Sequence, residues 1–380
     1  MTSRNIFLVG IDVDSMGGSQ RVLHTLAQGF AERGHRVCLV GIRPSPHPHR
    51  FHDRPAYRHA TLYSRPASPP WRPRTFAERL DLRAIRARRA ARADRERARR
   101  RMATLFARAP EGFVIIGSPW AADWLRGMPW PPGLRGIGQY HESYAQACSS
   151  ANLRLILRHY PEFEAAVFLS EQDAEEFRRQ RLPNVGVVPN PLPFRPAEPA
   201  PLDTAKVGAV GRLDAVKRLD RLIDAFADTG PPPGWELHLF GEGPLEAELR
   251  GHAARRGLAE RVRFRGPVGD MAAAYRELSV LALSSEREGR PMALAEAAAA
   301  GVPAVGFDLS GGVRELVADG RTGTLVPPHD TAALSRALAT LMADGALRRR
   351  YGAAAREHVR PLATPVVLDR WEELFAEIDR

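Results

Sequence analysis

The fold is decided by residues 6–42, which read IFLVGIDVDSMGGSQRVLHTLAQGFAERGHRVCLVGI. An apolar run of strand length, Ile6–Ile11, leads into a loop with two glycines, and apolar residues then recur at helical spacing until Gly34. A second apolar run follows at Val37–Ile42. Strand, loop, helix and strand make a βαβ unit, so the pattern predicts a parallel sheet with this loop at the carboxyl end of its first strand.

The same rhythm restarts after a proline-rich linker. Five prolines lie between residues 191 and 201, a density that neither a helix nor a sheet interior accepts. We therefore predict an N-terminal domain over 1–195 and a C-terminal domain over 196–364, with a last helix at about 365–380 that packs back on the first domain. Each domain is predicted to be α/β, a Rossmann-like doubly wound parallel sheet, and the two sheets face each other across a cleft.

Further strands are expected in both halves, and one stretch is expected to be irregular. In the N-terminal half the predicted strands are Phe113–Ile116, Gly136–Tyr140 and Ala165–Leu169, and the Pro- and His-rich residues 44–73 are expected to form no regular element. In the C-terminal half they are Val207–Val210, Glu236–Phe240, Val262–Phe264, Val280–Leu283 and Ala304–Gly306.

Composition bounds the class of protein. The chain has 380 residues, enough for two or three domains, and 44% of them are hydrophobic. Its apolar runs fall short of the roughly 20 residues of a membrane span, and no secretory signal is visible. The two cysteines, Cys38 and Cys148, make neither a disulfide framework nor a metal-ligand spacing. A cytoplasmic protein is expected.

The net charge of +11 is concentrated in one segment. Residues 79–101 hold eleven arginines against three acidic residues, and the alanines and arginines there favour a helix. A solvated helix face is the first interpretation, and contact with an anionic membrane surface or an anionic acceptor is the second. A nucleic-acid-binding protein is the non-enzyme alternative, but no aromatic residue lies between Phe76 and Phe106 to stack on bases.

A pair of carboxylates marks a candidate anion and sugar site. Glu288 precedes a predicted helix with Pro291 at its first position and Gly301 after its end, and Glu296 lies inside that helix. The free N–H groups of a first helical turn favour anions. A pyrophosphate at this helix start would have a carboxylate on each side to accept hydrogen bonds from sugar hydroxyls.

Cations follow the strand that opens the second half. Arg212 and Lys217 come after Val207–Val210, in the strand-end loop where such sheets bind ligands, and Lys217 is one of only two lysines in the chain. Two cations there suit a diphosphate whose negative charge grows as it leaves. Gly241 and Gly243 end the next strand and either let the backbone approach a ligand or form a plain turn.

With these motifs the chain resembles the family-4 retaining glycosyltransferases of GT-B fold. The matching residues are Gly17-Gly18 with the following Ser-Gln-Arg-Val, Gly34-His35, Gly211-Arg-Leu with Lys217, Gly243-Pro, and Glu288 through Glu296 with Gly301-Val-Pro. The resemblance covers nearly the whole chain and is strongest over residues 206–330. It implies transfer of a hexosyl-type sugar from a nucleotide-diphosphate sugar to an acceptor hydroxyl, with no cofactor and no resident metal.

The resemblance also implies a role for individual residues. Glu288 would contact the donor sugar hydroxyls, Glu296 the nucleotide ribose, and Arg212 with Lys217 the diphosphate. Gly17 and Gly18 would approach the distal phosphate, His141 would lie near the reacting centre, and Gly266-Pro-Val268 would contact the nucleobase. The catalytic set is then His141, Glu288, Arg212 and Lys217. The donor-binding set is Gly17, Gly18, Gly211, Arg212, Lys217, Gly241, Gly243, Val268, Glu288, Gly289, Arg290, Pro291, Met292, Ala293, Leu294 and Glu296.

Some features depart from the resemblance or compete with it. Arg290 stands where an apolar residue commonly follows Glu-Gly, and Gln20 stands where Glu is frequent, so the sugar is not carried over. His141 can equally be a hydrogen-bonded loop histidine. Asp12-Val-Asp14 has the D-x-D form of metal-dependent glycosyltransferases of another fold, which is the alternative enzyme. The expected partners are a nucleotide sugar and a hydroxyl-bearing acceptor, with an anionic or membrane-associated acceptor as the finer hypothesis and a peripheral position at the inner membrane face.

Overall fold

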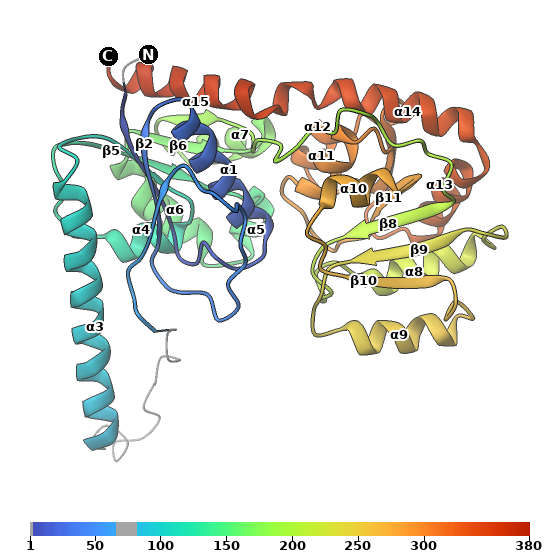
Figure 1. Ribbon diagram of the computed structural model, residues 1–380, viewed down its shortest axis with the longest axis horizontal. Coiled ribbons are helices and arrows are strands. Elements are labelled where there is room, and N and C mark those ends of the chain that lie inside the picture. Colours follow the sequence, from blue (N-terminus) through green and yellow to red (C-terminus); the bar gives the residue numbers. More distant parts are fainter. Residues whose placement is uncertain (1–2, 66–81) are drawn as a thin grey trace.

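The computed structural model describes residues 3–65 and 82–380 and contains two parallel sheets (Figure 1). The first has the strand order β3-β2-β1-β4-β5-β6-β7 and the second β10-β9-β8-β11-β12-β13, with every ladder parallel. The strands of the first are β1 Asn5–Gly10, β2 Arg36–Gly41, β3 Arg58–Thr61, β4 Glu111–Ile116, β5 Gly133–Gln139, β6 Ala165–Phe168 and β7 Val185–Val187. Those of the second are β8 Lys206–Val210, β9 Glu236–Phe240, β10 Val262–Gly266, β11 Val280–Leu283, β12 Ala304–Phe307 and β13 Gly323–Val326.

Helices connect the strands and cover both faces of each sheet. In the first half they are α1 Gly18–Glu32, α3 Leu82–Ala107, α4 Pro119–Leu125, α5 Tyr144–Cys148, α6 Asn152–His159 and α7 Glu171–Arg179. In the second they are α8 Leu219–Asp228, α9 Glu246–Arg255, α10 Met271–Arg276, α11 Met292–Ala299, α12 Gly311–Leu316, α13 Thr331–Ala343, α14 Gly345–His358 and α15 Thr364–Ile378, with 3₁₀ turns at Tyr160–Glu162 and Arg360–Leu362. Because both faces are covered, β1 is apolar and buried from Ile6 to Gly10, and all four residues of β11 are apolar and buried.

The predicted fold class is confirmed, and one local prediction is wrong. The Pro- and His-rich residues 44–73 were expected to be irregular, yet Arg58–Thr61 forms β3 at the sheet edge, in parallel register with Cys38–Gly41. An edge strand needs no continuous apolar run, and β3 is only partly buried. Residues 66–73 of that stretch, and residues 79–81 of the arginine-rich segment, lie outside the described residues.

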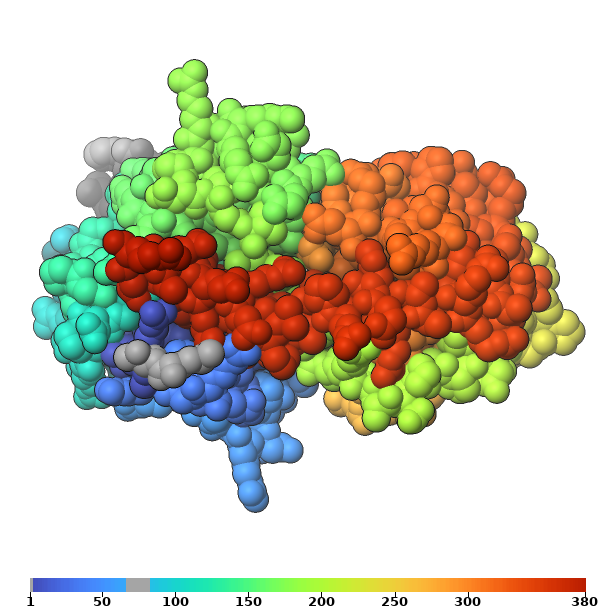
Figure 2. Space-filling model, turned by 90° about the horizontal axis from the view of Figure 1, so that it is seen from above, coloured from blue at the N-terminus to red at the C-terminus, as the bar shows by residue number. Residues whose placement is uncertain are grey.

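Helix α15 ties the two halves together. Its apolar residues Trp371 and Phe375 are fully buried on the first sheet, where Phe375 stacks on Phe113 with ring centroids 4.2 Å apart. Glu372 accepts hydrogen bonds from Arg33 at 2.8 Å and His35 at 3.0 Å. Figure 2 shows α14 and α15 as one band across both domains, and Arg4 before β1 pairs with Asp379 after α15 at 2.8 Å.

The chain crosses between the domains twice, and the two crossings are hydrogen-bonded to each other. Leu192 donates its N–H to the carbonyl of Leu362 at 2.8 Å and accepts from the Thr364 hydroxyl at 2.7 Å. Cys38 and Cys148 are both free thiols. Cys38 is buried and Cys148 is exposed. Within residues 3–65 and 82–380, no helix combines the length and the apolar content that crossing a bilayer requires.

Candidate functional site

The site is built around the start of α11, on the second sheet. Pro291 is the N-cap in extended conformation, one position earlier than predicted, and the helix begins at Met292. The backbone N–H groups of Met292 and Ala293 have no partner within the helix, because the first turn of a helix lacks preceding carbonyls. This end of α11 therefore presents positive partial charge toward the loop that carries Glu288.

Glu288 and Lys217 form an ion pair at this position. Lys217 Nζ lies 2.7 Å from Glu288 Oε1, and the hydroxyl of Ser285 donates to the same oxygen at 2.7 Å. The Lys217 side chain is 25% exposed and that of Glu288 12%. These two residues, predicted to bind different parts of a donor, are in direct contact in the structure.

Three glycines pack the two strand-end loops behind this pair. Gly211 has φ +155°, and a Cβ there would lie 2.9 Å from Lys217 Cε, so the lysine stem needs a glycine beneath it. A Cβ at Gly241 would meet the Gly211 carbonyl at 2.1 Å, and one at Gly243 the Leu213 carbonyl at 2.4 Å. The glycines at 241 and 243 thus serve loop packing, which favours the turn interpretation.

The second predicted cation is free to move. Arg212 is 73% exposed, and its nearest carboxylate, on Asp214, is 3.9 Å away. An exposed pair at that distance contributes little. Arg212 can therefore turn toward an anion at the end of α11 without breaking a strong contact.

Glu296 is buried inside α11 and receives groups from both domains. Tyr275 donates its hydroxyl to Glu296 Oε2 at 3.0 Å, and Arg21 of α1 lies 3.7 Å from Oε1. Burial raises the pKa of Glu296, and the nearby Arg21 and Tyr275 partly oppose that shift. Neither partner was predicted: Arg21 stands in the Gly17-Gly18 motif without an assigned role, and Tyr275 stands in no motif.

Arg290 is turned away from solvent and holds the first domain. Its guanidinium donates to the Leu169 carbonyl at 2.7 Å and pairs with Glu315 of α12, and only 10% of its side chain is exposed. Burial lowers the pKa of Arg290, and Glu315 opposes that shift. The other oxygen of Glu315 accepts the backbone N–H of Glu171 at 3.0 Å. Arg290, which stands where an apolar residue is common in the resembled family, thus links the second domain to the first.

The first domain brings its glycine loop to the start of α11. Gly17 caps α1 in extended conformation, and a Cβ on Gly18 would lie 4.0 Å from Met292 Cγ. Two helix N-termini, of α1 and α11, therefore approach one another. In the same loop the Asp12 carboxylate accepts the N–H groups of Asp14 and Ser15 at 2.9 and 3.0 Å, the pattern of a side-chain-capped turn.

His141 lies in the second loop that reaches this point. A Cβ on Gly289 would meet the Ser143 nitrogen at 2.8 Å, so the loop after β5 packs on the loop that carries Glu288. Both ring nitrogens of His141 are buried without a hydrogen bond in the described structure. Burial lowers the pKa of His141 to about 4, and Asn190 opposes this only in part. The ring is therefore neutral at pH 7.

The structure thus brings most of the predicted residues to one place between the domains. Gly17, Gly18 and His141 come from the first domain, and Arg212, Lys217 and Glu288–Leu294 from the second. Val268 is half-buried beyond Gly241, where the Gly241 N–H bonds the Gly266 carbonyl at 2.8 Å. Glu296 lies deeper in α11, four residues after its first residue.

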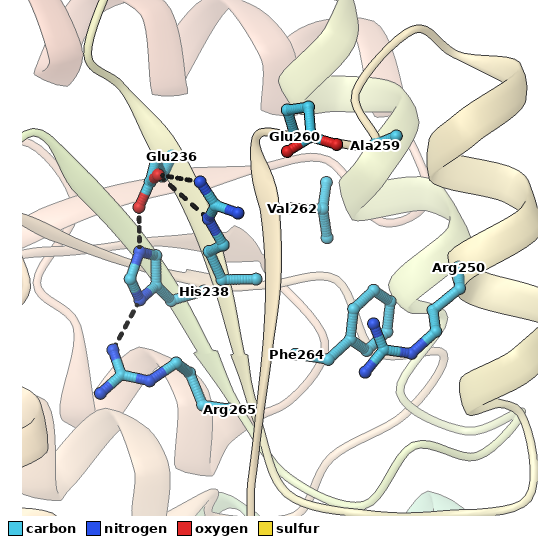
Figure 3. Close-up of a pocket in the computed structure, with 9 residues that line it drawn as sticks. Glu236, His238, Arg250, Ala259, Glu260, Val262, Phe264 and Arg265 are labelled. Carbon is cyan, nitrogen blue, oxygen red and sulfur yellow. Dashed lines mark hydrogen bonds and ion pairs between the residues drawn. The ribbon is translucent and has the colours of Figure 1, made fainter.

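A surface depression lies elsewhere and contains none of these residues. It follows the outer edge of β10 and is shown in Figure 3; its lining residues are Glu236, His238, Arg250, Ala259, Glu260, Val262, Arg263, Phe264 and Arg265. Glu236 already pairs with Arg263 at 3.0 Å and with His238 at 2.8 Å. Charged side chains of this depression already pair with one another, so we place the candidate functional site at the start of α11.

Two protein-family models match consecutive parts of the chain, from residue 16 to residue 358. The model described as Glycosyltransferase Family 4 matches residues 16–194, and the model described as Glycosyl transferases group 1 matches residues 193–358. The first match covers every strand of the first sheet except β1, and the second covers all the strands of the second sheet. The predicted family is confirmed by this pair of matches.

Curated relatives match over parts of their length. The chain is 38% identical over 231 residues to an exopolysaccharide phosphotransferase of Streptomyces coelicolor, covering 59% of this chain and 24% of that protein. It is 43% identical over 179 residues to a phosphatidyl-myo-inositol mannosyltransferase of Mycobacterium leprae, covering 46% of this chain and 44% of that protein. The chain thus spans a quarter to a half of the relatives it matches.

Solved structures share the whole fold. A variant of S. aureus TarM, in complex with fondaparinux, α-GlcNAc-glycerol and UDP, superposes with a TM-score of 0.80 over 98% of this chain and 99% of that one, at 12% identity. Sucrose-phosphate synthase from Thermosynechococcus elongatus gives 0.78 over 99% of each chain, at 20% identity. At these identities the likeness establishes the fold.

Proposed function

Because this chain belongs to the family 4 glycosyltransferases, we propose that it transfers a sugar from a nucleotide-diphosphate sugar to an acceptor hydroxyl with retention at the anomeric carbon. The observation that carries the proposal is the Lys217–Glu288 pair at the start of α11. A cation, a carboxylate and a helix N-terminus meet there, and a sugar diphosphate offers each of them a partner.

Donor binding would exchange the contacts of this pair. Lys217 moves its ammonium group from Glu288 to the diphosphate, and Glu288 then accepts hydrogen bonds from the sugar hydroxyls. Lys217 thus keeps an anionic partner, and the sugar hydroxyls supply hydrogen bonds to the Glu288 carboxylate in place of the ammonium group. Arg212, which has only a weak contact at 3.9 Å, joins the diphosphate from the exposed side.

The reaction then depends on stabilising the leaving diphosphate. The acceptor oxygen bonds to the anomeric carbon on the face that the diphosphate leaves, and the bond between that carbon and the phosphate oxygen breaks. The acceptor proton passes to the departing phosphate oxygen. Lys217, Arg212 and the N–H groups of Met292 and Ala293 stabilise the charge that develops there.

Two further residues take supporting roles in this proposal. Glu296, paired with Tyr275, would accept hydrogen bonds from the nucleotide ribose. His141 would hydrogen-bond a donor sugar hydroxyl as a neutral ring, because its pKa of about 4 keeps it uncharged at pH 7. A buried ring with two unpartnered nitrogens has the capacity for such a bond.

We also propose that the reaction needs no divalent metal. The groups nearest the expected diphosphate are Lys217, Arg212 and a helix N-terminus, all positive, and a dication among them would be repelled. Nucleoside diphosphate release should therefore persist in excess EDTA. If EDTA abolished this release and Mn²⁺ restored it, the proposal would be contradicted and the metal-dependent alternative with Asp12 and Asp14 would be favoured.

For the acceptor we propose a hydroxyl-bearing saccharide chain or glycolipid of the cell envelope, reached at the inner membrane face. Two relatives support this by name, the exopolysaccharide phosphotransferase above and an amylovoran biosynthesis glycosyltransferase of Erwinia amylovora, 30% identical over 170 residues. Neither name identifies the sugar that this chain transfers.

The two lysines offer a matched test. The nucleotide sugar that raises the melting temperature most in a panel is taken as the donor. The slow hydrolysis of that donor to nucleoside diphosphate then serves as the assay. Lys217→Ala should lower the rate about 10²–10³-fold, and Lys217→Arg should restore it only partly. Lys206→Ala is the control, because Lys206 pairs with Glu277 at the start of β8, away from α11.

Two results would contradict the proposal. One is that no nucleotide sugar or nucleoside diphosphate raises the melting temperature. The other is that Lys217→Ala and Lys206→Ala hydrolyse the donor at the same rate.

A further inference from the structure

Helix α3 has an anchored half and a projecting half. Ala98, Met102 and Phe106, spaced four residues apart, are fully buried against the first sheet, and Phe106 lies edge-on to Phe7 at 5.1 Å between ring centroids. Between residues 86 and 97 every residue is exposed except the half-buried Asp94. The helix therefore leaves the body of the protein, as Figure 1 shows.

The projecting half points past the carboxyl end of the sheet. Arg101 donates to the carbonyl of Leu62 at 2.9 Å, and Leu62 directly follows the last residue of β3. Residue 101 is thus level with the carboxyl ends of the strands, and residue 86 lies about 22 Å further along the helix axis. The loops that carry Gly17 and His141 leave the same edge of the sheet.

Four arginines on the projecting half have no partner among residues 3–65 and 82–380. Arg86, Arg89, Arg92 and Arg95 have no hydrogen bond or ion pair with any residue in the described part of the chain, whereas Arg97 pairs with Asp94 and Arg100 with Glu96. Residues three apart are neighbours on a helix, so the four form one continuous ridge with steps of about 4.5 Å along the axis. We call residues 86, 89, 92 and 95 the arginine ridge.

The ridge is costly to the free protein. Like charges three residues apart destabilise a helix, and Arg95 lowers the pKa of Arg99 on the next turn, after burial as the larger cause. By contrast, four arginines of the second domain, Arg218, Arg221, Arg256 and Arg263, each lie within 3.2 Å of a carboxylate. A row of unpaired cations suits a partner that supplies the anions.

We propose that the arginine ridge binds an anionic stretch of the acceptor chain, so that the acceptor is a polyanionic glycan held at a second point outside the transfer site. This inference rests on the proposed function. The ridge winds obliquely around the helix with evenly spaced charges, which fits a flexible linear polymer with repeated anionic groups, and guanidinium groups pair well with sulfate, phosphate or carboxylate.

Two other polyanionic surfaces fit the projecting half less well. A helix that enters a membrane interface carries large apolar residues on one side, but between residues 86 and 97 the apolar residues are all alanine. Binding to single-stranded nucleic acid uses aromatic side chains for base stacking, and this helix has none before Phe106.

The test compares two fourfold substitutions in the full chain. The ridge variant is Arg86→Gln, Arg89→Gln, Arg92→Gln and Arg95→Gln, since glutamine keeps helix propensity. The control removes the same charge from exposed arginines elsewhere, with Arg178→Gln, Arg179→Gln, Arg255→Gln and Arg349→Gln. The probe is dextran sulfate, with neutral dextran as blank, and binding is measured by calorimetry at several salt concentrations.

We expect the ridge variant to bind dextran sulfate about 30-fold more weakly, and the control variant within threefold of the parent. The slope of log affinity against log salt should fall by about 3 in the ridge variant. Equal weakening in both variants would overturn the inference. So would tighter binding of the parent to phosphatidylglycerol vesicles or single-stranded DNA than to dextran sulfate at matched charge.

A measurement of donor binding distinguishes a failure of this inference from a failure of the proposed function. Both fourfold variants should keep the parent's melting shift with the nucleotide sugar, because Lys217 and Glu288 are unchanged. A parent that binds dextran sulfate through the ridge without binding any nucleotide sugar would contradict the proposed function and, with it, the assignment of the polymer as acceptor. A parent that binds the donor, with variants that bind dextran sulfate alike, would contradict the ridge alone.

Discussion

Helices α11 and α3 are both rich in alanine, yet one is buried in the second domain and the other projects from the first. Residues 294–299 of α11 are all buried, and α3 is exposed from 86 to 97 apart from Asp94. Alanine favours helix formation in both segments, but it does not determine whether a helix is buried or exposed. The residues between the alanines differ: α11 has one charged residue, whereas α3 has cations on every side.

The comparison shows two ways of treating charge on a helix. The single carboxylate of α11, Glu296, is desolvated and has partners in both domains, Tyr275 and Arg21. The arginine ridge of α3 is hydrated and has none among the described residues. A buried charge requires partners within the fold, whereas an exposed charge is stabilised by water and stays available to a ligand.

The largest effect should come from giving α11 the chemistry of α3. Ala297→Arg buries a guanidinium at a fully buried position and should cost more than about 4 kcal/mol of unfolding free energy, enough to prevent folding. Ala91→Arg, at an exposed position of α3, should stay within about 0.5 kcal/mol. Soluble yield and urea unfolding measure both. Similar stabilities for the two variants would break the comparison.

A second prediction separates the two halves of α3. Met102→Ala removes a fully buried side chain and should cost about 3 kcal/mol, because a cavity remains beneath the helix. Arg92→Ala, in the arginine ridge, should leave the urea midpoint nearly unchanged. If Met102→Ala proves as mild as Arg92→Ala, the anchored half is not packed as described.

A third, smaller effect concerns Glu296 and pH. Burial raises the folded-state pKa of Glu296 above its ordinary value of 4.5, so its favourable contribution to stability is present below pH 4.5 and is lost as pH rises through the folded pKa. Glu296→Gln removes this loss. Its stability relative to the parent should increase between pH 4 and pH 8 in urea unfolding, with the exposed Glu248→Gln as control. A difference independent of pH would show that Glu296 is not desolvated.

The smallest effect should be a gain in stability from the ridge variant. Replacing the four arginines by glutamine removes the three like-charge pairs within the ridge and others with adjacent arginines, which should stabilise the protein by about 1 kcal/mol or less at low salt. The gain should vanish in 1 M NaCl, where the screening length is about 3 Å. Destabilisation at low salt would mean that these arginines have partners after all.

Much of the fold could be predicted, because buried parallel strands are apolar along their length. Ile6–Ile11 and Val37–Ile42 stand out for this reason, and parallel strands brought their carboxyl-end loops to a common edge. Arg58–Thr61 could not be predicted, since an edge strand that is exposed on one side needs only the hydrogen bonds of its neighbour.

The residues of the site were easier to predict than their partners. Lys217, Glu288 and Glu296 stand in motifs that lie within a few residues of a strand or helix end. Their contacts join residues far apart in sequence, Lys217 with Glu288 and Glu296 with Arg21. The turn of Arg290 toward Leu169 depends on how the two domains meet, which no local pattern records.

The position of α15 has a consequence for how the chain is made. Its Trp371 and Phe375 fill the same apolar layer as Phe30 and Phe113, which leave the ribosome some 260 residues or more before Phe375 does. At about 5–20 residues per second, that layer stays uncovered for roughly 13 s or longer, while the second sheet is still being translated. The first domain is therefore the first to be synthesised and the last to be completed, and the second must fold beside an unfinished neighbour.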